Sequence, residues 1–427
     1  MGLPKIKLAG GGERFQYLVH EYNDNTIRFV LNYPGILDVD ALRGAIKAVV
    51  ESVDILHGTF FSDPVNAYWS IHENVDEHNY FHYLETAGDP AITAYCQSLL
   101  PVYPEDKVQL HCTLVQSHCA SSLVIRISHL CVDGGDGKYL LQKLMEAYNR
   151  ILETGNADGL TVKNGNRAPE QVYGNLNAGE IKSLLTNPVF SVKTEYPFPT
   201  KETGRSRVIR RVIPADVMAK ARVKAKETGA TVNDLLLTAC YRAYAALDSV
   251  DSGAAMSVTS MMDLRRHCKD GESDGLCNMS GSMPTTLENG VSGSFADTLA
   301  EIVHQTTAAK ENPLAGLEGL PILHGATRTL PIGLLLKIAG KVYGSMSVGL
   351  TNLGNINCRD YALGNLVPTG GMFGGPLKKK PGMQVSVMSF DGECVLCIVG
   401  QYTNEDAVML QGTLDLMVQE VYDYANG

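Results

Sequence analysis

The amino-acid sequence predicts a mixed α/β protein, with α+β character in each half, that is built from two domains. Alternating patterns typical of half-buried strands are interleaved with the period of amphipathic helices in both halves of the chain. The 427 residues are long for a single hydrophobic core. Residues from about 155 to 203 are polar and rich in Asn, Gly, Pro and Thr, as is typical of a domain junction. We therefore predict an N-terminal domain over residues 1–180, a linker over 181–203 and a C-terminal domain over 204–427.

Each predicted element of the first half has a local signal. Residues 26–33 have the composition of a strand that ends at a Pro-Gly turn. Asp38 can cap a helix that runs to about residue 53 with one apolar face. Residues 108–114 and 123–127 alternate between apolar and polar side chains, which predicts a hairpin with one buried face. After this hairpin, Asp136 can cap another amphipathic helix.

The second half begins again with a strand, over residues 205–213, and a helix that starts near Pro214. Residues 231–234 (Thr-Val-Asn-Asp) are similar to a capping box in front of a strongly apolar helix. Asp391-Gly392 lies between two further strands and is a strong two-residue hairpin signal. Asn404 opens a final helix. Strands and helices therefore alternate to the end of the chain.

Composition and charge exclude several classes of function. Apolar residues make up 44% and charged residues 19% of the chain, an ordinary balance for a soluble globular protein. The net charge of −10 argues against nucleic-acid binding, which needs a basic surface. The ten cysteines have no framework spacing, so we expect reduced thiols in a cytoplasmic protein. The most apolar run, residues 330–340, is interrupted by Lys337 and is too short to cross a membrane. We also expect a monomer.

The strongest chemical signal is the sequence from Ser128 to Gly134, a His-x-x-x-Asp-Gly motif that closes the first-half hairpin. His129 shares the strand parity of the apolar positions before it, so its ring points inward if the strand continues that far. An imidazole is the side chain best suited to proton transfer near neutral pH. Asp133 can bond to the ring or hold the loop through a salt bridge, and the intervening turn favours the second role. Gly134 permits a close backbone approach. The plain alternative is a buried histidine beside an unrelated turn aspartate.

Several other segments of the chain also contain residues that are typical of one known superfamily. They are Gly35-Ile36-Leu37-Asp38, Leu56–Phe60, Ala230–Asp234, Asp263-Leu264-Arg265, Asn278 and Thr351-Asn352-Leu353-Gly354. Together with the motif, and in this order, they make residues 35–148 and 205–400 resemble the His-x-x-x-Asp-Gly acyltransferases. That superfamily includes the condensation domains of nonribosomal peptide synthetases, alcohol acetyltransferases and, more distantly, chloramphenicol acetyltransferase.

The resemblance implies a fold and a set of roles. The fold would be two chloramphenicol-acetyltransferase-like domains that form a pseudo-symmetric V with a tunnel between them. His129 would be the general base, and Asp133 would hold the loop. The oxyanion of the tetrahedral intermediate needs a donor. Thr351 and Asn352 are the candidates for that donor, and the alternative is that they form a polar turn closing a strand.

The sequence departs from the superfamily at two positions. Many members carry an arginine that pairs with the motif aspartate where this chain has His57. If His57 does not pair with Asp133, the loop is held by Arg126, Arg265 or a backbone contact. Condensation domains often have two consecutive histidines, whereas here Ser128 precedes the motif histidine. We therefore expect a stand-alone protein similar to alcohol acetyltransferases or condensation domains.

Further residues have weaker signals. Lys378-Lys379-Lys380 forms a basic loop that could receive the phosphates of coenzyme A or an acidic carrier protein, or could simply be solvated. Cys131 is close to His129 in sequence, but a small buried cysteine is more common than a catalytic thiolate in such a loop. Cys394 and Cys397 have metal-ligand spacing but face opposite sides of a predicted strand, which favours core packing. The histidines lack paired spacing and a nearby acidic set, so we expect no metal site.

The leading hypothesis is an acyltransferase that moves an acyl group from a thioester to a small-molecule alcohol or amine. The expected donor is acyl-coenzyme A as a co-substrate, or the phosphopantetheine of an acyl carrier protein, with no bound cofactor. One alternative is a cyclase or another condensation-like enzyme that uses His129 without acyl transfer. The other is a non-catalytic binding protein of the same fold.

Overall fold

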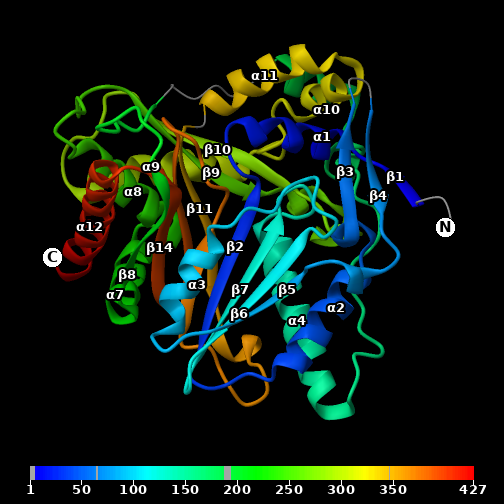
Figure 1. Ribbon diagram of the computed structural model, residues 1–427. Helices are drawn as coiled ribbons and strands as arrows, with labels where there is room; N and C mark the ends of the chain where they lie inside the picture. The colour runs from blue at the N-terminus through cyan, green and yellow to red at the C-terminus, as the bar shows by residue number, and fades with distance from the viewer. Residues whose placement is uncertain (1–4, 64–65, 187–193, 346) are drawn as a thin grey trace.

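A computed structural model describes residues 5–63, 66–186, 194–345 and 347–427 of the chain (Figure 1). The fold is mixed α/β, as predicted, with sheets of five, six and three strands. The predicted linker, residues 181–203, lies partly outside the described residues, and its first residues belong to helix α6 (Ala178–Thr186). Among the described residues, no helix has the length and apolar character needed to cross a membrane.

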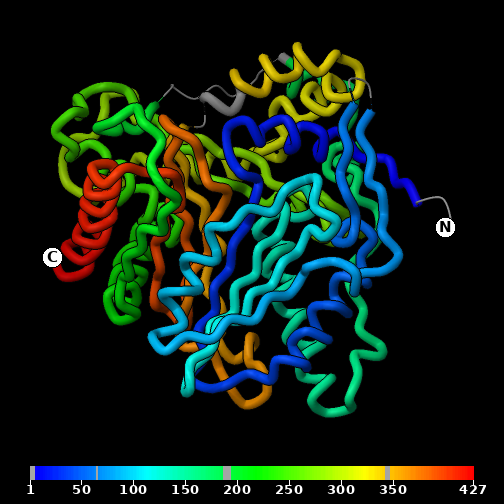
Figure 2. Tube along the Cα trace, in the orientation of Figure 1, coloured from blue at the N-terminus to red at the C-terminus, as the bar shows by residue number. Residues whose placement is uncertain are grey.

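The five-stranded sheet carries the motif hairpin and has the strand order β12-β2-β7-β6-β5. Its strands are β2 (Thr26–Tyr33), β5 (Phe81–Glu85), β6 (Leu110–Gln116), β7 (Ser121–Ser128) and β12 (Gly370–Gly374). Strands β6 and β7 form the predicted antiparallel hairpin, with Leu114 opposite Leu123. Strand β12 comes from the second half of the chain and pairs with β2, so the orange segment in Figure 2 lies against the blue one.

The six-stranded sheet belongs to the second half and has the order β10-β9-β11-β13-β14-β8. Its strands are β8 (Arg205–Ile213), β9 (Met256–Asp263), β10 (Ser280–Leu287), β11 (Val348–Ile356), β13 (Met383–Phe390) and β14 (Glu393–Tyr402). A three-stranded sheet of β1 (Lys5–Leu8), β4 (Ala67–Ile71) and β3 (Gly58–Ser62) lies at the edge of the first half.

Helices cover both faces of the five-stranded sheet, and the alternation of side chains along β2 shows which helix covers which face. Phe29 of β2 packs against Gly137 of α4 (Gly134–Thr154), whereas its neighbour Arg28 donates to the carbonyl of Ser98 in α3 (Pro90–Ser98). Since adjacent strand residues point to opposite faces, α4 and α3 cover opposite faces of the five-stranded sheet. Helix α2 (Val39–Glu51) packs beside α4.

In the second half, helices lie along the outer face of the six-stranded sheet, on the left of Figure 1. They are α7 (Ala215–Glu227), α8 (Val232–Ala245), α9 (Phe295–Glu311) and α12 (Asn404–Asn426). Helices α1 (Gly11–Leu18), α10 (Leu320–Thr329) and α11 (Ile332–Ser345) pack together at the top of the figure. The short helix α5 (Glu170–Tyr173) precedes α6.

The local signals in the sequence correspond to the observed element ends. Asp38 caps α2, with its side chain accepting a hydrogen bond from the backbone N–H of Ala41 at 2.8 Å. Thr231 and Asp234 form the predicted capping box at the start of α8. Asp391 and Gly392 both have positive φ, 47° and 96°, which matches the hairpin turn predicted there.

Candidate active site

His129 lies at the first position after β7, where the hairpin leaves the sheet. Its backbone N–H donates to the carbonyl of Asn25 at 2.7 Å, and its ring is half-buried. Ring atom Nδ1 lies 2.7 Å from the carbonyl oxygen of Val132. A carbonyl can only accept, so Nδ1 carries the hydrogen and the neutral ring has its lone pair on Nε2. This tautomer is the one that a base acting through Nε2 requires.

The surroundings of His129 favour its neutral form. Burial lowers the pKa of the ring below its ordinary value, although the Val132 carbonyl and the Asp133 carboxylate oppose this shift. Asn278 approaches from the second half of the chain, with Nδ2 at 3.1 Å from Nδ1 of His129. Both nitrogens carry hydrogens in this tautomer, so the approach is a close contact and not a hydrogen bond, and the shorter bond to the Val132 carbonyl sets the tautomer. The side-chain oxygen of Asn278 accepts from the backbone N–H of Ser280 at 3.2 Å, which fixes the amide next to the ring. Asn278 is among the residues that resemble the acyltransferase superfamily, but the resemblance alone implied no role for it.

Asp133 is buried and holds the end of the motif loop through three hydrogen bonds. Its Oδ1 caps α4 by accepting from the backbone N–H of Asp136 at 2.9 Å. Its Oδ2 accepts from the backbone N–H of Met279 and from Nη1 of Arg265, both at 2.8 Å. The carboxylate therefore joins the start of α4 to the second half of the chain and makes no bond to the His129 ring.

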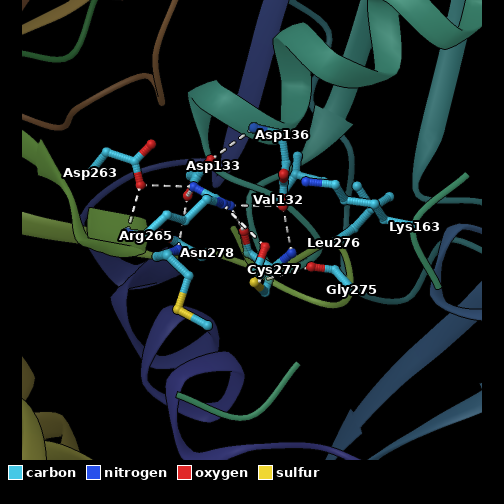
Figure 3. Close-up of polar contacts among 12 residues, drawn as sticks. Val132, Asp133, Asp136, Lys163, Asp263, Arg265, Gly275, Leu276, Cys277 and Asn278 are labelled. Atoms are coloured by element: carbon cyan, nitrogen blue, oxygen red, sulfur yellow. Dashed lines mark hydrogen bonds and ion pairs between the residues drawn. The ribbon is translucent and has the colours of Figure 1, made fainter. Parts of the chain in front are cut away.

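Of the possibilities that the sequence left open for Asp133, two are present: the side chain of Arg265 and a backbone contact, from the N–H of Met279. His57 instead places Nδ1 at 2.6 Å from the carbonyl of His72, and Arg126 donates to the carbonyl of Leu100 at 3.3 Å. Arg265 can reach because η4 (Leu264–His267), which follows β9, presents it toward the start of α4 (Figure 3).

The helix cap predicted at Asp136 is wrong: Asp133 caps α4, and Asp136 lies inside the helix. Asp136 lies one turn inside the helix, where its Oδ2 accepts from Nη2 of Arg265 and from the backbone N–H of Cys277, both at 2.8 Å. Burial and the nearby Asp133 charge raise the pKa of Asp136 to about 6, in spite of Arg265. Burial would lower the pKa of Arg265, but Asp133 and Asp136 outweigh it and raise that pKa. Two buried carboxylates therefore share one guanidinium.

The segment proposed for the oxyanion lies against the motif through its leucine. A Cβ atom on Gly134 would lie 2.5 Å from Cδ2 of Leu353, so glycine permits this close approach. Thr351 and Asn352 are half-buried in β11, and the Asn352 side-chain oxygen accepts from the backbone N–H of Gly354 at 2.8 Å. Across the described residues, neither side chain forms a hydrogen bond with His129.

The three lysines do not form the solvated basic loop that the sequence suggested. Lys378 is 4% exposed, and burial lowers its pKa to about 8. Lys380 forms an ion pair with Asp406 and donates to the carbonyl of Glu202 at 2.7 Å, so it serves the packing of the second half. Lys379 alone is exposed. Backbone pairing of the loop with Asn23 turns the first lysine inward, an effect that local sequence does not reveal.

The three cysteines that the sequence singled out are core residues. Cys131 is fully buried, its Sγ lies 3.7 Å from the carbonyl of Ile55, and burial raises the pKa of the thiol. A raised pKa disfavours the thiolate that a nucleophile needs. Cys394 and Cys397 are buried in β14 and belong to different hydrophobic cores, one on each face of the strand. The prediction of core packing for this pair is confirmed.

Sequence reasoning gave no role to Arg167, which the structure places behind the motif. Its side chain donates to the backbone carbonyls of Leu130 and Cys131, both at 3.1 Å. Arg167 lies in the polar segment predicted as a domain junction, where a lone arginine carries no distinguishing pattern. The contact forms because the folded chain places this segment next to the motif turn.

No protein-family model and no curated protein matches this sequence. Solved structures match over nearly the whole chain. Polyketide synthase associated protein 5 from Mycobacterium tuberculosis is 15% identical, with 98% of each chain covered and a TM-score of 0.70. The trichothecene 15-O-acetyltransferase TRI3 from Fusarium sporotrichioides is 13% identical, with 97% of this chain and 95% of that chain covered and a TM-score of 0.70.

The condensation domain of the Monacolin K polyketide synthase MokA is 12% identical, with 100% of this chain and 99% of that chain covered and a TM-score of 0.69. The fold of the chain is therefore the one shared by condensation domains and this acetyltransferase. That agrees with the fold the sequence resemblance implied.

Proposed function

We propose that this protein is an acyltransferase that moves an acyl group from a thioester to an alcohol or amine, with His129 as the general base. The observation that carries the proposal is the contact between Nδ1 of His129 and the Val132 carbonyl. It leaves Nε2 as the basic atom of a ring that burial keeps neutral. The shared fold with an acetyltransferase and with condensation domains supports the same class of reaction.

The proposed reaction follows from this tautomer. Nε2 of His129 removes the proton from the acceptor O–H or N–H as the oxygen or nitrogen attacks the thioester carbonyl carbon. The tetrahedral intermediate then collapses, the C–S bond breaks, and the sulfur leaves with the proton that His129 holds. A free thiol and an ester or amide are the products. Thr351 and Asn352 stay our candidates for donors to the oxyanion.

Two kinds of thioester fit the proposal. Coenzyme A and the phosphopantetheine of a carrier protein present the same reacting atoms. Two of the solved structures named above are associated with, or part of, polyketide synthases, so a carrier-bound donor belongs beside acyl-coenzyme A in any test. We propose the exposed Lys379 as a contact for the donor phosphates.

The test measures thiol release from acyl-coenzyme A and acyl-pantetheine with a panel of alcohols and amines. We expect acceptor-dependent release by the wild type and its loss in His129→Ala. His118→Ala is the matched control, because His118 is exposed in the turn between β6 and β7 and should leave the rate unchanged. Release that survives in His129→Ala would overturn the base assignment. No release with any donor would favour the cyclase or binding alternatives.

A further inference from the structure

Arg167 contacts the motif turn but has no role in the reaction proposed above. Its side chain is 10% exposed and reaches the turn between His129 and Asp133 from the side of the polar segment that follows α4. Nη1 donates to the carbonyl of Cys131 and Nη2 to that of Leu130, both at 3.1 Å. These carbonyls belong to the two residues directly after His129.

The same guanidinium holds two further segments. Nη1 also donates to the carbonyl of Leu276, two residues before Asn278. Nη2 and Nε bond to Oε1 of Glu13 in α1, at 2.7 and 3.2 Å. Arg167 therefore joins the motif turn, the segment that brings Asn278 to the ring, and the first helix of the chain.

Glu13 is itself held by two hydrogen bonds, so Arg167 is anchored to a side chain with a fixed position. Its Oε1 accepts from the indole N–H of Trp69 at 2.9 Å, and its Oε2 accepts from the backbone N–H of Gly10 at 2.5 Å. The Glu13 side chain is only 13% exposed. Burial would lower the pKa of Arg167, but the Glu13 charge outweighs it and raises that pKa, so the guanidinium stays charged.

The position of these bonds relative to the catalytic ring suggests what they do. The His129 ring is oriented by the carbonyl of Val132, which lies between two anchored parts of the turn. Arg265 fixes the later part through Asp133, and Arg167 fixes the earlier part through Leu130 and Cys131. A planar fork of donors suits two successive carbonyls, whereas an ammonium group does not.

We propose that Arg167, anchored by Glu13, is a positioning residue for the acyl transfer that holds the motif turn and thereby keeps Nε2 of His129 aimed at the acceptor. This inference rests on the proposed function, since it concerns the aim of the proposed base. A displacement of about 1 Å in such a group can cost about 100-fold in rate.

A neighbouring cavity makes the proposal testable by chemical rescue. It has a volume of about 310 Å³ and is lined by Arg167 and Glu13, together with the half-exposed Lys7 and the exposed Arg328. Because its lining includes exposed residues, a small cation can enter from solvent and occupy the space that a truncated Arg167 leaves. Guanidinium has the planar donors of arginine, and ammonium has only the charge.

The first experiment follows thiol release by Arg167→Ala and Arg167→Lys. We expect kcat to fall by up to about 100-fold in Arg167→Ala with KM little changed. Added guanidinium, at concentrations that leave the wild type folded, should restore part of kcat, and ammonium at equal ionic strength should not. Arg167→Lys should stay impaired. Arg328→Ala is the matched control, because Arg328 lines the same cavity but pairs with Glu170, and its rate should be unchanged.

The second experiment does not depend on activity. The Nδ1–H proton of His129, held by the Val132 carbonyl, should give a slowly exchanging NMR signal in the wild type. We expect this signal to be lost in Arg167→Ala and recovered with guanidinium. An unchanged signal, or a lower melting temperature with no change in kcat and no rescue, would overturn the positioning role. If the wild type releases no thiol at all, the proposed function fails, while the NMR signal still decides whether Arg167 orients the ring.

Discussion

Asp136→Asn is expected to stabilise the protein at neutral pH, although it removes one partner of a buried ion pair. The Asp136 side chain is 4% exposed and shares Arg265 with Asp133. Burial and the Asp133 charge raise the pKa of Asp136 to about 6. Asparagine keeps an oxygen for the bonds from Arg265 and from the backbone N–H of Cys277, and it has no charge to desolvate.

The magnitude follows from the balance of protons between the folded and unfolded states. The unfolded carboxyl has a pKa of about 4, so between about pH 4 and pH 6 the folded protein holds a proton that the unfolded chain has lost. The stability that this proton contributes is complete below about pH 4 and is lost as the pH rises through about 6. At about 1.4 kcal/mol per tenfold change in the proton equilibrium, the loss amounts to about 3 kcal/mol at neutral pH. Asp136→Asn behaves as a permanently protonated Asp136 and should avoid this loss.

The assay is urea unfolding at about pH 4, 5.5 and 7. The fluorescence of the single tryptophan, Trp69, is a suitable signal because this residue is 1% exposed. Asp263→Asn is the control. The Asp263 side chain is 60% exposed, and its Oδ1 lies 3.1 Å from Nη1 of Arg265. Loss of its charge should therefore change the free energy of unfolding by less than about 1 kcal/mol at each pH. The reasoning is refuted if Asp136→Asn is less stable than the wild type at neutral pH, or if their difference does not change with pH.

Two further predictions concern the same site. The proposed acyl transfer should need neutral His129, whose pKa is lowered by burial, so kcat/KM should fall only below about pH 6.5, the ordinary histidine value. An acidic limb centred above neutrality in the pH–rate profile would contradict this. Arg265→Met should lower the free energy of unfolding by about 3–5 kcal/mol in urea, because it leaves the carboxylates of Asp133 and Asp136 buried without their cation. The neighbouring exposed arginine supplies the control as Arg266→Met, and equal effects of the two substitutions would rule out the ion-pair explanation.

Those parts of the fold that depend on local interactions could be predicted from the sequence. The cap of α2 by Asp38 and the capping box at Thr231 involve groups within three residues of each other. The turn at Asp391-Gly392 needs only residues that tolerate positive φ. The position of His129 at the end of a hairpin likewise follows from the alternation within β6 and β7. Each of these features is decided by a few neighbouring residues, so its pattern is visible in the chain.

The sequence by itself therefore determined the elements that have strong local signals, the motif, and the chemistry of an imidazole at the end of a strand. Only the tertiary structure decided which groups hold that imidazole. Arg265 binds Asp133 across 132 positions of the chain, and Arg167 reaches the motif turn from a segment without a distinguishing pattern. The burial of Lys378 also results from the way distant strands meet. Local periodicity specifies which face of an element is apolar, but the pairing of buried charges depends on which elements come together, and that is settled only when the two halves of the chain pack.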